Sequence, residues 1–235
     1  MVAVERGLAP SPKAEHVSAE KLRNYPEAAI GKLLCVKPSG EAGSCTATFV
    51  TTNRVLLTAA NCIVNKEDGS INSDFIFIGN YGSVIQQSYG VDCLAFPEGW
   101  LIGDDAGAWR FNYAFLRTTN TNIFGGLGLT NALVPRKLSQ VGFADGLHQG
   151  LRIKRVDSDA YMTKDGLVAS AFTVLGAGSS GNPWMRNSIV HSLSSHYDPE
   201  QPDIVLGPRI TATTMKILKH VGQGCPAPVK QEIAP

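Results

Sequence analysis

Short apolar runs separated by glycine, asparagine, aspartate and proline cover the chain from about residue 28 onward. Runs with this punctuation are typical of antiparallel β-strands. In the first half the pattern predicts a short helical turn over residues 59–64 and strands over residues 31–36, 44–51, 54–58, 75–79, 83–89, 91–96 and 113–117.

The second half continues the same pattern and then changes to a helical one. Predicted strands cover residues 136–142, 151–158, 160–163, 167–172, 182–186, 188–194 and 205–209. After these strands, Thr211 is a suitable N-cap, and Met215, Leu218 and Val221 lie on one face of a helix. Glycines 222 and 224, with a proline at 226, end this helix. The whole pattern predicts an all-β fold with a short C-terminal helix.

We divide the chain into four parts on this basis. Residues 1–27, rich in Ala, Glu, Lys and Pro, form an N-terminal leader that we expect to be loosely attached. The first β unit covers residues 28–125, with a linker near 122–129, and the second β unit with the helix covers 126–224. Residues 225–235 form a tail.

Composition excludes several classes of protein. Of the 235 residues, 43% are hydrophobic and 17% are charged, which is the balance of a folded chain. A formal net charge of +1 gives no electrostatic reason to expect nucleic acid or an anionic membrane as partner. No apolar run is long enough to span a membrane, and residues 1–24 lack the apolar core of a signal peptide. No Cys-x-x-Cys or His-x-x-His spacing occurs, so we expect no zinc site and no cofactor.

One glycine-rich stretch carries candidate chemistry. It reads Gly-Ala-Gly-Ser-Ser-Gly-Asn-Pro-Trp over residues 176–184. Glycines let the backbone turn sharply and let a ligand approach the main chain. In that setting the amides of Gly178 and Ser180 could converge in front of the Ser180 hydroxyl, as an oxyanion hole requires. By itself such a run is more often a turn or a linker.

Motifs upstream of this stretch strengthen the case that Ser180 is a nucleophile. Residues 45–50 and 55–62 read Cys-Thr-Ala-Thr-Phe-Val and Val-Leu-Leu-Thr-Ala-Ala-Asn-Cys, and residues 111–116 read Phe-Asn-Tyr-Ala-Phe-Leu. In order and spacing, these and the serine stretch resemble the histidine, aspartate and serine motifs of the chymotrypsin-fold serine proteases. Further segments, over residues 30–33, 75–79, 96–100 and 207–210, resemble the V8-like (glutamyl endopeptidase) branch of this family. The resemblance covers residues 25–224 and implies two antiparallel six-stranded β-barrels followed by a C-terminal helix.

The chain departs from this family at two catalytic positions. Asn61 stands at the histidine position and Asn112 at the aspartate position, whereas Ser180 is retained at the nucleophile position. A serine hydroxyl needs a neighbouring base to take its proton, and an asparagine amide cannot accept one. A branch member would also use a histidine near His191 to bind a substrate glutamate; a hydrogen-bonded structural histidine is the competing interpretation of this residue.

The five cysteines allow at most two intramolecular disulfides. The resemblance implies a disulfide between Cys45 and Cys62, beside the histidine position. Which two of Cys35, Cys93 and Cys225 pair, if any do, the sequence leaves open. We expect a secreted, monomeric protein.

Two hypotheses for the function follow. In the first, the chain is a proteolytically inactive homologue that acts by binding a protein or peptide partner. In the second, it is a glutamyl-specific serine endopeptidase, captured as an inactive variant or working through an unrecognised triad. The missing base at Asn61 favours the first hypothesis.

Overall fold

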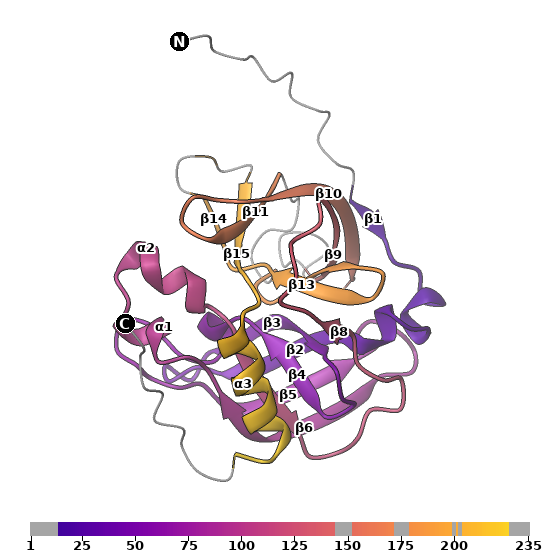
Figure 1. Cartoon of the computed structure of the whole chain (residues 1–235). Coiled ribbons are helices and arrows are strands. Elements are labelled where there is room, and N and C mark those ends of the chain that lie inside the picture. The colour runs from indigo at the N-terminus through magenta and orange to yellow at the C-terminus, as the bar shows by residue number, and fades with distance from the viewer. Residues whose placement is uncertain (1–13, 144–151, 172–178, 199–200, 202–203, 226–235) are drawn as a thin grey trace.

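A computed structural model describes residues 14–143, 152–171, 179–198, 201 and 204–225. The strands of the first half form the lower part of the molecule in Figure 1 and those of the second half the upper part, with helix α3 (Ala212–Gly222) lying across the lower part. Within the described residues, no helix has the length and apolar character needed to cross a membrane.

The first half is a closed barrel of six antiparallel strands, as predicted. The strands follow one another around the ring in the order β2, β3, β4, β7, β6, β5. Their bounds are β2 Ile30–Val36, β3 Ala42–Phe49, β4 Val55–Thr58, β5 Ser73–Gly79, β6 Gln87–Ala95 and β7 Ala114–Thr118.

Aromatic side chains fill this barrel. Phe49 lies edge-on to Phe77, with ring centroids 5.1 Å apart, and to Tyr89, with centroids 5.4 Å apart. All three are buried. Edge-to-face pairs of this kind add roughly 0.5–1.5 kcal/mol each to the effect of burial alone.

Among the described residues the second half is a mixed sheet of nine strands. The predicted all-β fold, with two β units and a short C-terminal helix, is confirmed, and closure of the second unit into a six-stranded barrel stays a prediction. Among the described residues the strands form an open path in the order β14, β15, β11, β10, β9, β12, β13, β8, and β1 pairs with β10. The β8–β13 pair is parallel. Bounds are β1 Glu15–His16, β8 Gly128–Leu129, β9 Lys137–Gly142, β10 Lys154–Met162, β11 Leu167–Ala171, β12 Pro183–Arg186, β13 Ile189–Leu193, β14 His196–Tyr197 and β15 Ile204–Pro208.

Two strands are longer than predicted, because each changes its partner midway. β6, expected as two strands, pairs with β5 up to Gly90 and with β7 from Val91. β10, also expected as two, pairs with β9 up to Asp159 and with β11 from Ala160. A strand that passes from one neighbour to the next needs no turn at the point where its pairing changes.

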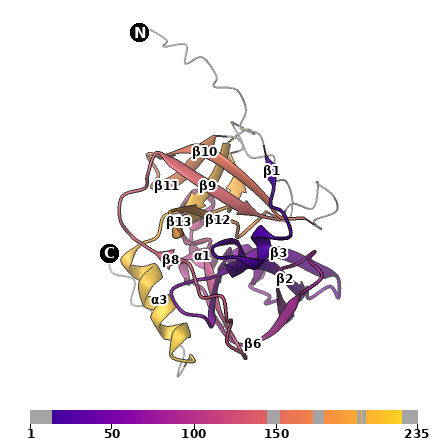
Figure 2. The ribbon, with the colours of Figure 1, turned by 90° about the vertical axis from the view of Figure 1, so that its right-hand side faces the viewer.

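The leader is attached more firmly than expected. From Glu15 on, it pairs with β10, and the Val17 amide donates to the Ile153 carbonyl over 3.2 Å. Leu22 is buried in the core. Figure 2 shows β1 lying against β10. The expectation of loose attachment is therefore wrong from Glu15 on, and residues 1–13 lie outside the described part of the chain.

Helix α3 forms as predicted. Its N-cap Thr211 accepts from the Thr214 amide, and the Thr214 side chain accepts from the Thr211 amide, so that the two residues form a capping box. Ile217, Leu218 and Val221 are buried against the barrel, and Met215 is partly buried. The remaining helical segments are α1 Gly99–Ile102, α2 Asp105–Ala108 and the 3-10 turns Lys21–Arg23, Glu27–Ala29, Ala60–Cys62 and Trp109–Phe111.

Two disulfides join segments that are distant in sequence. The Cys45–Cys62 bond forms as predicted and links β3 to the turn that carries Asn61. Cys93 on β6 pairs with Cys225, which follows α3, so this bond fixes the end of the helix to the barrel. Cys35 is the free and buried cysteine. Disulfides that close long loops stabilise small domains by roughly 2–4 kcal/mol.

Candidate active site

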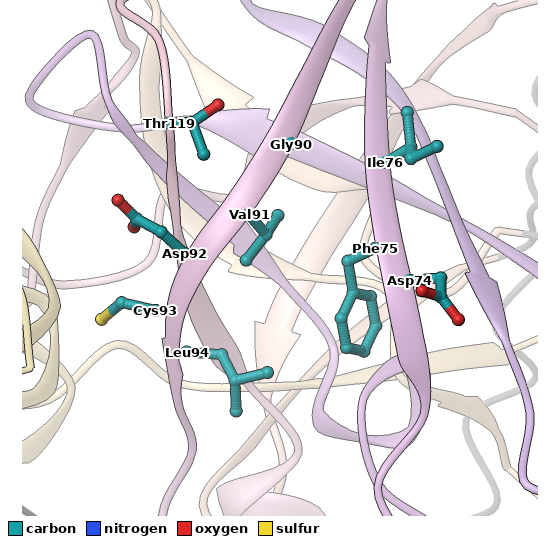
Figure 3. A pocket seen from close by; sticks show the side chains of 9 residues that line it. All are labelled: Asp74, Phe75, Ile76, Gly90, Val91, Asp92, Cys93, Leu94 and Thr119. Atoms are coloured by element: carbon teal, nitrogen blue, oxygen red, sulfur yellow. The ribbon is translucent and has the colours of Figure 1, made fainter.

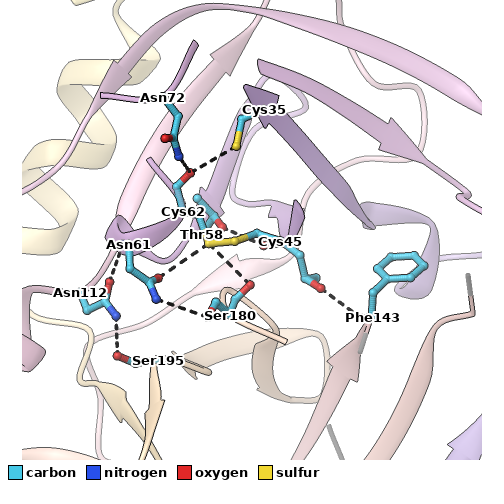
Figure 4. The surroundings of a disulfide bond; sticks show 11 residues. Cys35, Cys45, Thr58, Asn61, Cys62, Asn72, Asn112, Phe143, Ser180 and Ser195 are labelled. Atoms are coloured by element: carbon cyan, nitrogen blue, oxygen red, sulfur yellow. Dashed lines mark hydrogen bonds between the residues drawn. A yellow bond between two sulfur atoms is a disulfide. The ribbon is translucent and has the colours of Figure 1, made fainter. Parts of the chain in front are cut away.

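Asn61, Asn112 and Ser180 come together at the junction of the two halves. Asn61 lies in the turn after β4, Asn112 lies just before β7, and Ser180 lies just before β12. The side-chain amide of Asn61 donates to Ser180 Oγ over 3.4 Å, and the Asn61 backbone amide donates to Asn112 Oδ1 over 2.9 Å (Figure 4). The structure therefore brings together the three positions at which the sequence predicts a catalytic triad.

The Asn112 amide makes a further bond into the second half. Asn112 is fully buried, and its Nδ2 donates to Ser195 Oγ over 2.6 Å (Figure 4). Ser195 Oγ also lies 3.2 Å from His196 Nδ1. Since the Ser195 oxygen accepts from Asn112, its own proton is available to this nitrogen, an arrangement that favours the histidine tautomer protonated on Nε2. Sequence reasoning missed Ser195, which no motif marked.

Because position 61 holds no histidine, an asparagine at position 112 is better satisfied than a carboxylate would be. Its oxygen accepts from the Asn61 backbone and its nitrogen donates to Ser195, so both polar atoms are satisfied. A carboxylate could only accept, and it would place a charge at a fully buried position. The network is therefore neutral and complete.

Among the described residues, no side chain that could act as a base is hydrogen-bonded to Ser180 Oγ. In the part of the chain that the structure describes, the Asn61 amide is the side chain hydrogen-bonded to Ser180 Oγ. It directs a donor at the hydroxyl oxygen and offers no site for its proton. The arrangement can hold the hydroxyl in place, and it cannot activate it.

The backbone around Ser180 is held by the first barrel. The Thr46 amide on β3 donates to the Ser180 carbonyl over 3.0 Å, and the Thr58 hydroxyl donates to the Thr46 carbonyl over 2.8 Å. Gly181 has φ +86°, and an added Cβ there would clash with the Thr46 carbonyl oxygen. This turn therefore requires glycine for both conformation and space. Gly178, the other residue proposed for the oxyanion hole, lies outside the described residues.

A histidine and a tryptophan close one side of the site. The rings of Trp109, before β7, and His196, on β14, are stacked with centroids 3.8 Å apart and planes 18° apart. Burial lowers the pKa of His196 to about 4, against the opposing effect of the Asp198 carboxylate. The His196 ring is therefore neutral at pH 7 and packs as an aromatic surface between the two halves.

His191 lies away from this network. It is buried on β13, and burial, with a smaller effect of the nearby Arg186 charge, lowers its pKa. The part of this segment that meets the serine turn is Ser194, whose carbonyl accepts from the Gly181 amide over 2.8 Å. His191 precedes Ser194 by three residues, and three residues of extended chain span about 10 Å. A role for His191 in a specificity pocket stays a prediction.

Asn182 follows the serine turn and faces away from solvent. It is fully buried, and a Cβ added to Gly142 on β9 would clash with its side-chain amide. Neither amide atom has a hydrogen-bond partner within the described residues. The side chain therefore packs against β9, where only glycine leaves room for it.

A groove begins at Asn61 and extends over the first half. Its volume is about 800 Å³. Its lining includes Trp100 and Leu101 from α1 and Trp109 from the 3-10 turn that follows α2. Lys37, Lys66 and Asp68 line it from the loops after β2 and after the Asn61 turn. The groove combines apolar and charged lining. Among the described residues, no group of three or more His, Cys, Asp or Glu side chains could hold a metal ion.

The lowered pKa of His196 makes stability depend on pH. An unfolded histidine binds a proton below pH 6.5, whereas His196 in the folded chain does so only near pH 4. The free energy of unfolding should therefore fall as the pH drops through this window, by about 2 kcal/mol after allowance for partial exposure. His196→Phe, which keeps a ring on Trp109, should flatten this dependence in denaturant titrations, and His220→Phe should not. An unchanged slope in His196→Phe would contradict the assignment.

Comparisons with known proteins identify the fold. No family model and no curated protein sequence matches the chain. Among solved structures, the thermostable serine protease AL20 from an extremophilic microorganism superposes with a TM-score of 0.74 at 18% identity, covering 84% of this chain and 98% of that one. A Glu endopeptidase superposes with a TM-score of 0.73 at 16% identity, covering 91% of this chain and 98% of that one. The scabies mite inactivated protease paralogue S-D1 superposes with a TM-score of 0.67 at 16% identity, covering 90% of this chain and 97% of that one. The chain has the chymotrypsin-like fold of these serine protease structures.

Proposed function

We propose that this chain is a secreted serine-protease homologue without peptidase activity, which acts by binding a protein or peptide partner. The observation that carries the proposal is the neutral network Ser180–Asn61–Asn112–Ser195, in which an amide donor occupies the place of the base. Removing the base of a serine protease lowers turnover on the order of a million-fold. What remains, roughly 10³–10⁴-fold over the reaction in water, is too little for a working protease.

A replacement base is the alternative that would keep the chain an enzyme. Among the described histidines, His196 contacts the network, and its bond there is to Ser195 rather than to Ser180. Its pKa of about 4 also makes it a weak base at neutral pH. These two properties argue against an unrecognised triad built on His196.

Support for the binding role comes from the groove and from the fold. The groove of about 800 Å³ reaches Asn61, so a peptide lying in it would pass the site without being cut. The scabies mite paralogue, described as an inactivated protease, shares this fold, which gives loss of activity a precedent there. Two disulfides support a location outside the cell.

Restoring the two missing groups should restore hydrolysis. The double variant Asn61→His, Asn112→Asp should cleave peptides measurably and faster than either single variant, because triad groups act as a unit. Asn112→Asp alone should lower the unfolding midpoint, because it buries a carboxylate without an imidazolium beside it. Hydrolysis would be followed with a peptide library that includes substrates cleaved after glutamate.

The control for this experiment is Ser180→Ala placed in the double variant, which should abolish any recovered activity. A double variant that folds normally and stays inert would show that the site has lost more than its base and orienting group. Cleavage by the unaltered chain that disappears in Ser180→Ala would contradict the proposed function.

Partner binding should depend on the groove. Leu101→Arg places a charge in its lining, and Ile123→Arg makes the same change at an exposed side chain that does not line it, 77% exposed in the structure. A protein captured from extracellular fluid should bind the unaltered chain and Ile123→Arg equally, and Leu101→Arg at least tenfold more weakly in a binding titration. Equal binding by all three would show that the groove is not the interface.

A further inference from the structure

A gap between two strands of the first barrel lies apart from the site. β5 and β6 pair from Gly79–Gln87 to Ile76–Gly90 and no further. Beyond this point β6 pairs with β7, and β5 continues beside β2. Figure 3 shows the two ribbons diverging there, with side chains of both strands around the space between them.

The gap is a pocket of about 600 Å³ with an apolar lining and an acidic edge. Its apolar lining includes Phe75 and Ile76 on β5 and Val91 and Leu94 on β6. Ile76 is exposed, as are Ser73 and Asp74 before it, whereas Phe77 and Gly79 further along the strand are buried. Such a pair of separated strands offers backbone groups and apolar contacts to an extended segment, which is the arrangement used in β-strand addition.

The two carboxylates at this pocket differ in their partners. Asp92 is paired with Arg117, whose Nε lies 2.8 Å from Asp92 Oδ1, and with Arg54 over 3.8 Å. Asp74 accepts from the Ser73 hydroxyl over 2.8 Å, and no ion pair joins it to a described cation. The pocket therefore has one carboxylate available for a positive charge.

The chain carries a segment of suitable composition close by. Cys93, which lines the pocket, is bonded to Cys225, so the chain that follows Cys225 is tethered to a lining residue. This segment contains Val229 and Ile233 with Lys230 between them. Ten residues reach up to about 33 Å, far enough to cross the pocket. A tethered segment also has an effective concentration in the millimolar range, so weak contacts suffice to bind it.

We propose that residues 226–235 bind in the pocket between β5 and β6, with Val229 or Ile233 against its apolar lining and Lys230 at Asp74. The segment then covers Phe75, Ile76, Val91 and Leu94 and completes the face of the barrel where β6 leaves β5. This proposal is independent of the peptidase activity and of the groove at Asn61.

Amide hydrogen exchange tests this directly. The chain of residues 1–235 is compared with one ending at Cys225, which keeps both disulfides. Exchange at Asp74, Phe75 and residues 91–94 should be at least tenfold slower in the longer chain. Equal exchange in the two chains, each shown to be folded by near-ultraviolet circular dichroism, would overturn the proposal.

Charge reversal tests the Lys230–Asp74 contact. Asp74→Lys and Lys230→Glu should each reduce the protection in the full chain, and the two together should restore it. Asp165→Lys, an exposed change in the second half, serves as the matched control and should have no effect. Protection that rises with protein concentration would mean that the segment of a second copy fills the pocket, and would overturn binding within one chain.

Discussion

The hydrogen bonds of the buried Asn112 amide connect the two halves of the molecule at the candidate site. The Asn112 oxygen accepts from the backbone of the turn that carries Asn61, and its nitrogen donates to Ser195 in the second half. Each such bond contributes roughly 0.5–1.5 kcal/mol net, whereas a buried amide atom left unpaired costs roughly 1–3 kcal/mol. The position of Asn61, and through it the contact with Ser180, depends on this amide. Within the described residues, the same neutral network places an amide donor, and not a base, at the Ser180 hydroxyl, as the proposed function requires.

The remaining structure keeps the frame of a protease around this altered centre. Thr46 and Thr58 of the barrel hold the Ser180 turn, Gly181 permits its conformation, and the Cys45–Cys62 bond fixes the neighbouring turn. None of these features takes part in proton transfer, so none of them requires a histidine at position 61. A site that is ordered but not activated is what a binding function needs, because a held ligand is not consumed.

Motifs with a local signal were predictable from the sequence, and contacts between distant segments were not. The barrel, the capped helix and the Cys45–Cys62 bond follow from apolar runs, the Thr211 cap and the family resemblance. β6 and β10 were each divided in two, because a strand that changes partner carries a glycine or a charged residue at the change, which resembles a turn signal. Four-residue helices such as α1 are too short to show a periodic pattern. Ser195 and the stacked His196 have no motif, since their roles arise only when the second half folds against Asn112 and Trp109.

The reactivity of the Ser180 hydroxyl tests the central claim most directly. A fluorophosphonate probe reports whether a serine is activated, independently of which peptide the cleft accepts. At neutral pH the unaltered chain should show no labelling above that of its Ser180→Ala variant, with peptide mass spectrometry locating any adduct. Stoichiometric labelling at Ser180 would show that a base reaches this hydroxyl and would contradict the account.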